Sequence, residues 1–206
     1  GEVVLMDFGC EYANYNADMT RTIPVSGKFS RRQKQVYNAV LRTLRACING
    51  LKPGKKPKDW QKEAEQFMEK ELVDLGLITT KQIREQTKDA PALKKYFMHG
   101  VGHPLGLDVH DVTHTVRPMQ PGWVMTVEPG IYIPEEGFAV RLENDVLVTE
   151  NGTVDLMADI PIEPEEIETL MQRRPRNGNG HSSPGHNGGN GRKVERLLLR
   201  RASMVA

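Results

Sequence analysis

The chain has 206 residues, of which 38% are aliphatic or aromatic, and its formal net charge is +1. This length suffices for one domain with a packed core, and the near-neutral charge argues against nucleic-acid binding by the chain as a whole. The charge is unevenly spread, because positions 173–206 hold eight Lys or Arg and one Glu, a net of +7, which leaves −6 for the rest. We therefore expect an acidic domain over residues 1–172 and a basic tail over residues 173–206.

Cysteine content and hydropathy bear on the compartment. Only Cys10 and Cys47 occur, so a disulfide framework is not expected, and a reducing, cytoplasmic environment is. No apolar run approaches the roughly 20 residues that span a bilayer, and we expect no membrane partner. The chain starts with Gly1 and not with Met, which suggests a piece of a longer protein.

The first 25 residues predict a pair of strands. Residues 3–6 form an apolar run typical of a buried strand, which ends at Asp7 before Gly9 allows a turn. A polar stretch leads to Asp18, and residues 20–25 show the alternation of a second strand. We expect this second strand to pair back on the first.

Two amphipathic helices are predicted next. Ser30 and Gln33 fit a capping box at the start of the first helix, and Gly50 with the Pro-Gly pair at 53–54 ends it. Asp59 can cap the second helix, which Gly76 ends. Each helix has one apolar face, which indicates core packing and no chemistry. These faces comprise Val36, Val40, Leu41, Leu44, Cys47, Ile48 and Leu51 in the first helix and Trp60, Ala64, Phe67, Met68, Leu72 and Leu75 in the second.

The rest of the chain predicts a sheet, a short helix and a tail. After a polar connection, apolar segments at 123–127, 138–142 and 146–148 are separated by turn residues and indicate strands. Residues 163–171 favour a final helix. From position 173 onward Gly, Asn, Ser, Pro and Arg dominate, so we expect a disordered tail, in which only residues 194–201 could form a brief basic helix.

Five side chains near the expected strand ends form the informative constellation. Asp7 and Asp18 flank the first turn, His103 closes the segment HGVGH, and Glu128 and Glu143 occur inside apolar strand patterns. Taken singly, each aspartate is typical of a turn, and the histidine of a structural or exposed side chain. A carboxylate in an apolar strand needs a cation, a metal or hydrogen bonds. Four carboxylates and one imidazole suit divalent Mn, Fe, Co or Zn, and their excess negative charge favours two ions.

These motifs resemble the pita-bread metallopeptidases of family M24, which include aminopeptidase P, prolidase and methionine aminopeptidase. The ligand order Asp, Asp, His, Glu, Glu is complete, and the match runs from position 2 to about 171. The segment HGVGH followed by VHD is similar to aminopeptidase P or prolidase and unlike methionine aminopeptidase. DFGCEY at Asp7 and DMTRT at Asp18 are most similar to bacterial aminopeptidase P. The resemblance implies an α+β chain with the C-terminal half of the pita-bread fold.

The resemblance also implies a ligand set. Asp7 would bind one ion, Asp18 and Glu143 would bridge two ions, and His103 and Glu128 would hold the other. Glu128 would also act as the general base. Two divalent ions are thus expected, with Mn²⁺ as the first candidate and Co²⁺, Zn²⁺ or Fe²⁺ as alternatives.

Four further residues acquire roles from the same resemblance. His99 and His110 would contact the scissile amide and stabilise the oxyanion, Tyr132 would line the substrate site, and Arg141 would support the ligands from outside. The alternative for His110 is a structural histidine held by Asp111. The remaining histidines are expected to have no role in the site, and they are His114, His181 and His186.

The activity implied is release of the N-terminal residue from peptides with proline in second position, with a hydroxide held by two metal ions as nucleophile. The partner is then a proline-containing peptide, with no nucleic acid, and the family allows a homo-oligomer of the full-length protein. The resemblance covers only the C-terminal part of the family's catalytic domain, so we expect this chain alone to be inactive without an N-terminal half.

Three other functions compete with this one. A prolidase would accept only Xaa-Pro dipeptides, but the short link between Glu128 and Glu143 lacks the long insertion that some prolidases carry. A non-enzymatic pita-bread module would typically lose ligands, and this chain keeps all five. The basic tail could bind nucleic acid or an acidic partner, but it lacks interleaved aromatic residues.

Overall fold

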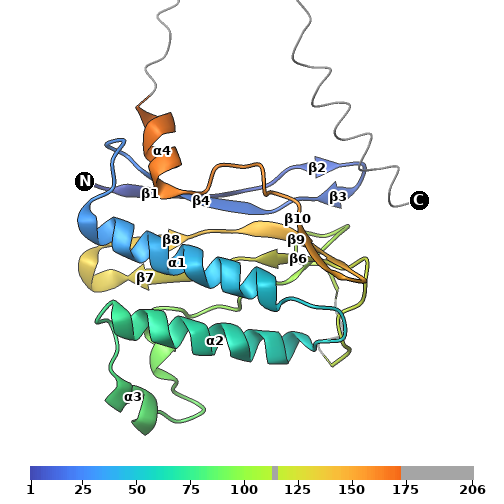
Figure 1. Ribbon diagram of the computed structural model, residues 1–206, viewed down its shortest axis with the longest axis horizontal. Helices are drawn as coiled ribbons and strands as arrows, with labels where there is room; N and C mark the ends of the chain where they lie inside the picture. Colours follow the sequence, from blue (N-terminus) through green and yellow to red (C-terminus); the bar gives the residue numbers. More distant parts are fainter. Residues whose placement is uncertain (113–115, 173–206) are drawn as a thin grey trace, which may run out of the picture. The chain divides into compact units, whose positions relative to one another are not determined.

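The computed structural model describes residues 1–112 and 116–172 (Figure 1). His114, His181, His186 and the segment 194–201 lie outside the described residues. The division of the chain at residue 172 and the disorder of the tail therefore stay predictions.

The N-terminal segment forms the predicted pair of strands. β1 (Val3–Phe8) runs antiparallel to β4 (Met19–Pro24), with Asp7 opposite Thr20. A small hairpin of β2 (Glu11–Tyr12) and β3 (Tyr15–Asn16) connects them. Its two turn residues, Ala13 and Asn14, have φ values of 53° and 65°, the conformation that a two-residue hairpin turn requires. The strand pairing is confirmed, although β1 continues past the predicted end and includes Asp7.

Two long helices follow, and one of their predicted starts is wrong. α1 (Arg31–Gly50) begins at the predicted capping box, in which Ser30 and Gln33 each bond the other's backbone N–H. α2 (Pro57–Asp74) begins two residues before Asp59, and Asp59 lies in its first turn. The reason is Pro57, whose fixed φ suits the first helical position and whose missing N–H needs no partner there.

The second half of the chain supplies most of the sheet structure. Four antiparallel strands form a sheet in the order β10–β9–β6–β5, and a separate hairpin pairs β7 with β8. The predicted strands at 123–127, 138–142 and 146–148 correspond to β6, β8 and β9. The bounds are β5 (Pro104–Leu105), β6 (Val124–Val127), β7 (Gly130–Ile133), β8 (Phe138–Arg141), β9 (Asn144–Thr149) and β10 (Gly152–Asp155). The final helix, α4 (Pro164–Met171), was also predicted.

The polar connection between α2 and the sheet contains two elements that the sequence analysis missed. α3 (Thr80–Glu85) starts at a capping box formed by Thr79 and Gln82, and a short 3₁₀ turn covers Ala92–Lys95. No side chain of α3 is buried, so the apolar periodicity that reveals a core helix is absent. The Thr79 capping signature alone could have revealed it.

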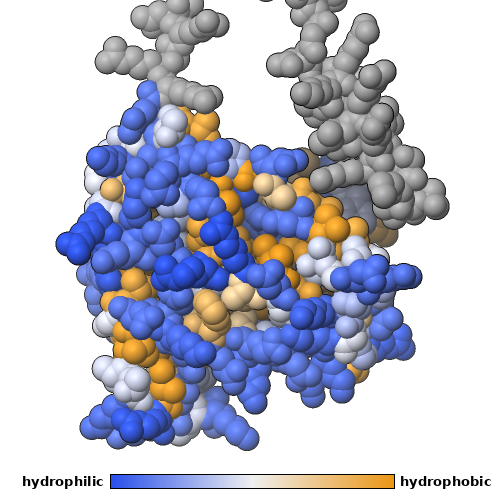
Figure 2. Space-filling view, in the orientation of Figure 1, coloured by the Kyte–Doolittle hydropathy of each residue, from blue (hydrophilic) through white to orange (hydrophobic). Residues whose placement is uncertain are grey.

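The hydrophobic core lies between the helices and the strands. α1 crosses β7 and β8, and α2 runs beside α1 (Figure 1). Val40, Leu44 and Trp60 are buried there, and the indole N–H of Trp60 donates to the carbonyl of Cys47 over 2.9 Å. The outward surface of both helices is mainly hydrophilic (Figure 2). Within the described residues, no helix has the length and apolarity needed to cross a membrane.

Candidate metal centre

The five predicted ligands come from five segments whose ends meet along one edge of the strands. Asp7 lies in β1, and Asp18 directly precedes β4. His103 directly precedes β5, Glu128 directly follows β6, and Glu143 lies between β8 and β9. The two glutamates therefore occupy strand ends, where the chain leaves the ladder and a side chain can turn towards its neighbours.

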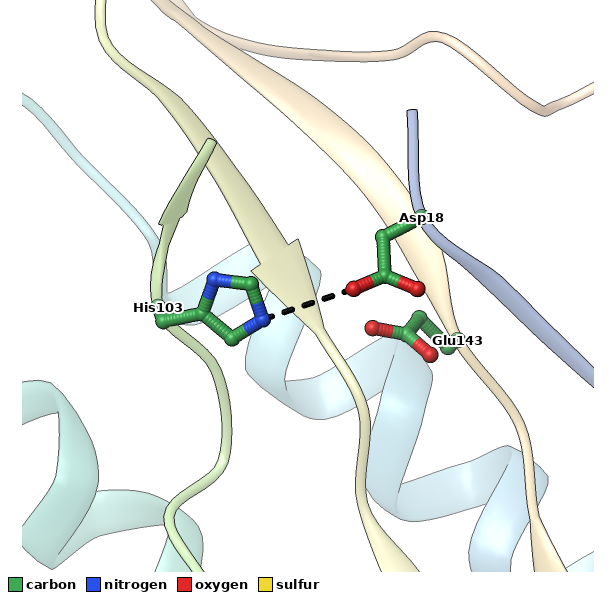
Figure 3. Close-up of side chains that lie close together, drawn as sticks. All are labelled: Asp18, His103 and Glu143. Atoms are coloured by element: carbon green, nitrogen blue, oxygen red, sulfur yellow. Dashed lines mark ion pairs between the residues drawn. The ribbon is translucent and has the colours of Figure 1, made fainter. Parts of the chain in front are cut away.

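Three of the five side chains form a tight cluster. Asp18, His103 and Glu143 each offer one ligand atom, and these atoms lie within 4.8 Å of one another. Figure 3 shows the three side chains converging, with Nε2 of His103 3.5 Å from Oδ2 of Asp18. The mixture of two carboxylates and one imidazole is a donor set for a borderline divalent ion.

The other two predicted ligands lie beside this cluster. Glu128 is in contact with it, because its Oε1 lies 3.6 Å from Nε2 of His103. Asp7 is more exposed, and its carboxylate forms an ion pair with the guanidinium of Arg141. The structure thus brings four predicted ligands together. The fifth, Asp7, lies next to them and is paired with Arg141.

Two threonines that the sequence analysis did not select hold the carboxylates in place. The hydroxyl of Thr20 donates to Oε2 of Glu143 over 2.6 Å. The hydroxyl of Thr126 accepts the backbone N–H of His103 over 3.0 Å and lies 3.4 Å from Oε1 of Glu128. Both threonines are fully buried. The sequence signal for Thr126 was its position in a strand beside a candidate ligand, which many strand threonines share, whereas Thr20 also lies in the DMTRT segment at Asp18.

His99, Tyr132 and Arg141, three of the residues expected around the substrate site, form one hydrogen-bonded network. Nε2 of His99 lies 2.9 Å from the hydroxyl of Tyr132, which accepts from Nη1 of Arg141 over 3.1 Å. Arg141 also donates from Nε to the hydroxyl of Thr20 over 3.0 Å. Because Thr20 in turn holds Glu143, the network links the predicted substrate residues to the carboxylate cluster.

His110 lies against His103, one member of the cluster. Its ring centroid is 4.1 Å from that of His103, at an angle of 68°. The carboxylate of Asp111, which the alternative interpretation would use to hold His110, instead accepts the backbone N–H of Val112 over 2.8 Å. The placement of His110 beside a predicted ligand favours a role in the site over a purely structural one.

Burial disfavours the charged form of the clustered carboxylates. It raises the pKa of Glu143 to about 8 and that of Glu128 to about 7. Burial also raises the pKa of Asp18, and the neighbouring Asp7 raises it further. Asp145 accepts the backbone N–H of Asp18 over 3.1 Å, and burial raises its pKa to about 7. The clustered carboxylates outnumber the nearby guanidinium of Arg141, and divalent cations fit the donors and the charge of this site.

These pKa shifts predict an inverse pH dependence of stability for metal-free protein. A carboxyl with a raised folded-state pKa binds more protons when folded than when unfolded, so stability falls as pH rises through this interval. The melting temperature of chelator-treated protein should therefore fall between about pH 4.5 and pH 8, where Glu143 ionises. Differential scanning calorimetry with and without Mn²⁺ measures the effect. A melting temperature of the metal-free protein that rises across the same interval contradicts the prediction.

Comparison with known proteins places the chain in a family. The model of metallopeptidase family M24 matches residues 1–150. The chain belongs to metallopeptidase family M24. Membership in this metallopeptidase family implies that the protein binds divalent metal ions, which agrees with the carboxylate and imidazole donors of the cluster. The predicted resemblance is thereby confirmed.

Individual relatives are aminopeptidases. The Xaa-Pro aminopeptidase of Escherichia coli is 41% identical over 183 residues, which cover 83% of this chain and 41% of that protein. Human Xaa-Pro aminopeptidase 3 is 42% identical and is covered over 36% of its length. This M24 chain thus spans about two fifths of the length of these relatives.

Solved structures confirm the predicted pita-bread fold. The zinc-substituted E. coli aminopeptidase P in complex with product superimposes with a TM-score of 0.74 at 40% identity, over 82% of this chain and 41% of that one. Icp55 of Saccharomyces cerevisiae superimposes with a TM-score of 0.73 at 33% identity, over 84% of this chain and 45% of that one. Because both identities are well above 25%, the likeness extends to the family as well as the fold.

Proposed function

We propose that this M24 chain carries the metal centre of an aminopeptidase that releases the N-terminal residue from peptides with proline in second position. The observation that carries the proposal is the convergence of Asp18, His103 and Glu143 beside Glu128. The relatives named Xaa-Pro aminopeptidase support the substrate class. The ligand roles of Asp7, Asp18, His103, Glu128 and Glu143 are part of this proposal.

The protein's own residues have three tasks in the proposed reaction. Two divalent ions, when bound, supply a nucleophile derived from water and polarise the scissile carbonyl. Glu128 accepts a proton at its carboxylate, because it lies in the cluster beside His103 and burial raises its pKa to about 7. His99 and His110 flank the cluster and donate to the peptide, while Tyr132 and Arg141 fix the position of His99.

The choice between an aminopeptidase and a prolidase depends on the region between Glu128 and Glu143. This region is a short hairpin, β7–β8, closed by a 3₁₀ turn at Pro134–Glu136. It holds no inserted segment able to cover the free carboxyl end of a dipeptide. We therefore propose that the substrate continues beyond the proline.

Hydrolysis of matched substrates by the full-length protein tests the proposed function. Release of the first residue from an Xaa-Pro-Xaa tripeptide should exceed cleavage of the corresponding Xaa-Pro dipeptide, and an Xaa-Ala-Xaa tripeptide should resist cleavage. A chelator should abolish activity, and Mn²⁺ should restore it. Faster cleavage of the dipeptide would identify a prolidase, and activity that survives complete metal removal would exclude a metallopeptidase.

Three finer expectations stay predictions. Manganese is proposed as the metal, and metal analysis of the isolated protein tests it against the zinc named for one structural relative. The cytoplasmic location is compatible with two free cysteines, Cys10 and Cys47, although one relative is named a mitochondrial peptidase. Homo-oligomer formation is proposed for the full-length protein and is tested by its mass in solution.

A further inference from the structure

Arg21 is a buried cation on the side of β4 that faces away from the carboxylate cluster. Only 4% of its surface is exposed. Successive side chains of a strand point to opposite faces, so Thr20 reaches the cluster, whereas Arg21 reaches the segment that precedes α4. Arg21 lies in the DMTRT segment at Asp18, but the family roles described above do not include it.

Within residues 1–112 and 116–172, all the hydrogen-bond acceptors of Arg21 are backbone carbonyls. Its Nη1 donates to the carbonyl of Glu143 over 2.7 Å and to the carbonyl of Thr20 over 2.9 Å. Its Nε donates to the carbonyl of Pro161 over 3.0 Å. Its Nη2 is buried and has no partner among the described residues. Such a placement is costly for a charge, because guanidinium groups are normally buried against carboxylates.

The carbonyl contacts fix the backbone of Glu143 from behind. The N–H of Glu143 donates to the carbonyl of Thr20 over 3.1 Å, and that carbonyl also accepts from Arg21. On the front face, the Thr20 hydroxyl holds the carboxylate of Glu143 over 2.6 Å. Glu143 is therefore held at its N–H, its carbonyl and its carboxylate by two adjacent residues of one strand.

The positive charge of Arg21 also helps to keep the carboxylates of the cluster together. Burial lowers the pKa of the Arg21 guanidinium, and the groups that oppose this shift through space include the carboxylates of Asp155 and Glu143. A fixed positive charge behind a cluster of four carboxylates reduces their mutual repulsion, which otherwise drives the ligands apart. Groups behind the ligands of a metal site orient them and tune affinity in this way.

We propose that Arg21 is a positioning residue for the metal centre, which holds Glu143 in its binding position through the backbone and through its charge. This inference rests on the proposed function, because it assigns a ligand role to Glu143. It predicts that Arg21 contributes to metal affinity and turnover without touching the ion or the substrate.

The proposal is tested with two variants of the full-length protein, Arg21→Met and Arg21→Lys. Calorimetric titration of Mn²⁺ into each metal-free variant and into the metal-free wild type gives the Kd for Mn²⁺. Arg21→Met should weaken the Kd for Mn²⁺ by about 10- to 100-fold and lower kcat by a similar factor, with KM nearly unchanged. Arg21→Lys retains the positive charge but loses the planar guanidinium and some of its hydrogen bonds. Its affinity for Mn²⁺ should therefore lie between those of Arg21→Met and the wild type.

Arg42→Met is the matched control. Arg42 donates two hydrogen bonds to Glu71 between α1 and α2, away from the cluster. This variant should lower the melting temperature and leave the Kd for Mn²⁺ at the wild-type value. Stability loss alone then cannot account for weaker metal binding in the Arg21 variants.

The Kd and kcat of the Arg21 variants decide whether Arg21 positions the metal centre. A folded Arg21→Met variant with wild-type Kd and kcat overturns the proposal. If Arg21→Met does not fold, Arg21→Lys decides in its place, and a wild-type Kd in that variant has the same consequence. A wild-type protein that binds no Mn²⁺ contradicts the proposed function, and the inference about Arg21 falls with it.

Discussion

Replacement of Glu143 by Gln should abolish tight metal binding while making the metal-free fold more stable at pH 8. Glu143 is 1% exposed, and burial raises its pKa to about 8. Glutamine keeps the shape and the acceptor for the Thr20 hydroxyl, and it removes a charge that the metal-free site disfavours. A neutral amide is a poor ligand for two ions, so kcat/KM of the full-length protein should fall by about three orders of magnitude, equivalent to about 4 kcal/mol.

Elemental analysis after dialysis and thermal melting with and without Mn²⁺ measure both effects. The control is Glu71→Gln, which changes another buried glutamate whose partner is Arg42 and which lies outside the site. That variant should lose stability and keep its metal. A Glu143→Gln protein with normal metal content contradicts the assignment of Glu143 as a bridging ligand.

Replacement of Gly102 by Ala should be nearly as damaging, although Gly102 has no side chain to contribute. A Cβ at this position would lie 2.0 Å from the carbonyl oxygen of Thr126 and 3.1 Å from the Trp60 ring. The backbone next to His103 runs against β6, where Thr126 and His103 exchange hydrogen bonds in both directions. Relief of the clash must move His103, and a displacement of about 1 Å in a catalytic site costs roughly 100-fold in rate.

Gly100→Ala is the matched control for this prediction, in the same HGVGH segment. A Cβ there meets the Gln61 amide oxygen at 3.7 Å and the carbonyl oxygen of Gly102 at 4.0 Å, and both are ordinary contacts. Its effect on stability should stay within about 0.5 kcal/mol, and the Kd for Mn²⁺ should not change. Equal losses in the two variants would show that the segment tolerates no side chain at all and that the close approach to Thr126 is not the cause.

The sequence was informative wherever a local rule determines the structure. The Ser30–Gln33 capping box placed the start of α1, because the cap is satisfied by residues three positions apart. Apolar periodicity identified the core faces of α1 and α2, because only one face of each helix packs against the strands. The same rules did not reveal α3, which buries no side chain. They misplaced the start of α2, where Pro57 competes with Asp59 for the first turn.

The candidate ligands could also be named from the sequence, because acidic residues inside apolar strands are rare without a cation and because four carboxylates and one histidine matched a family order. Their mutual placement could not be derived from the chain alone. Asp18 and Glu143 are 125 positions apart and meet only because β4 lies against the turn between β8 and β9. Thr20 and Arg21 lie in the DMTRT segment that resembles the family, but only the tertiary structure showed what Thr20, Thr126 and Arg21 contact. Their roles arise from hydrogen bonds between segments that no local pattern encodes, since strand pairing over long separations depends on the packing of the whole domain.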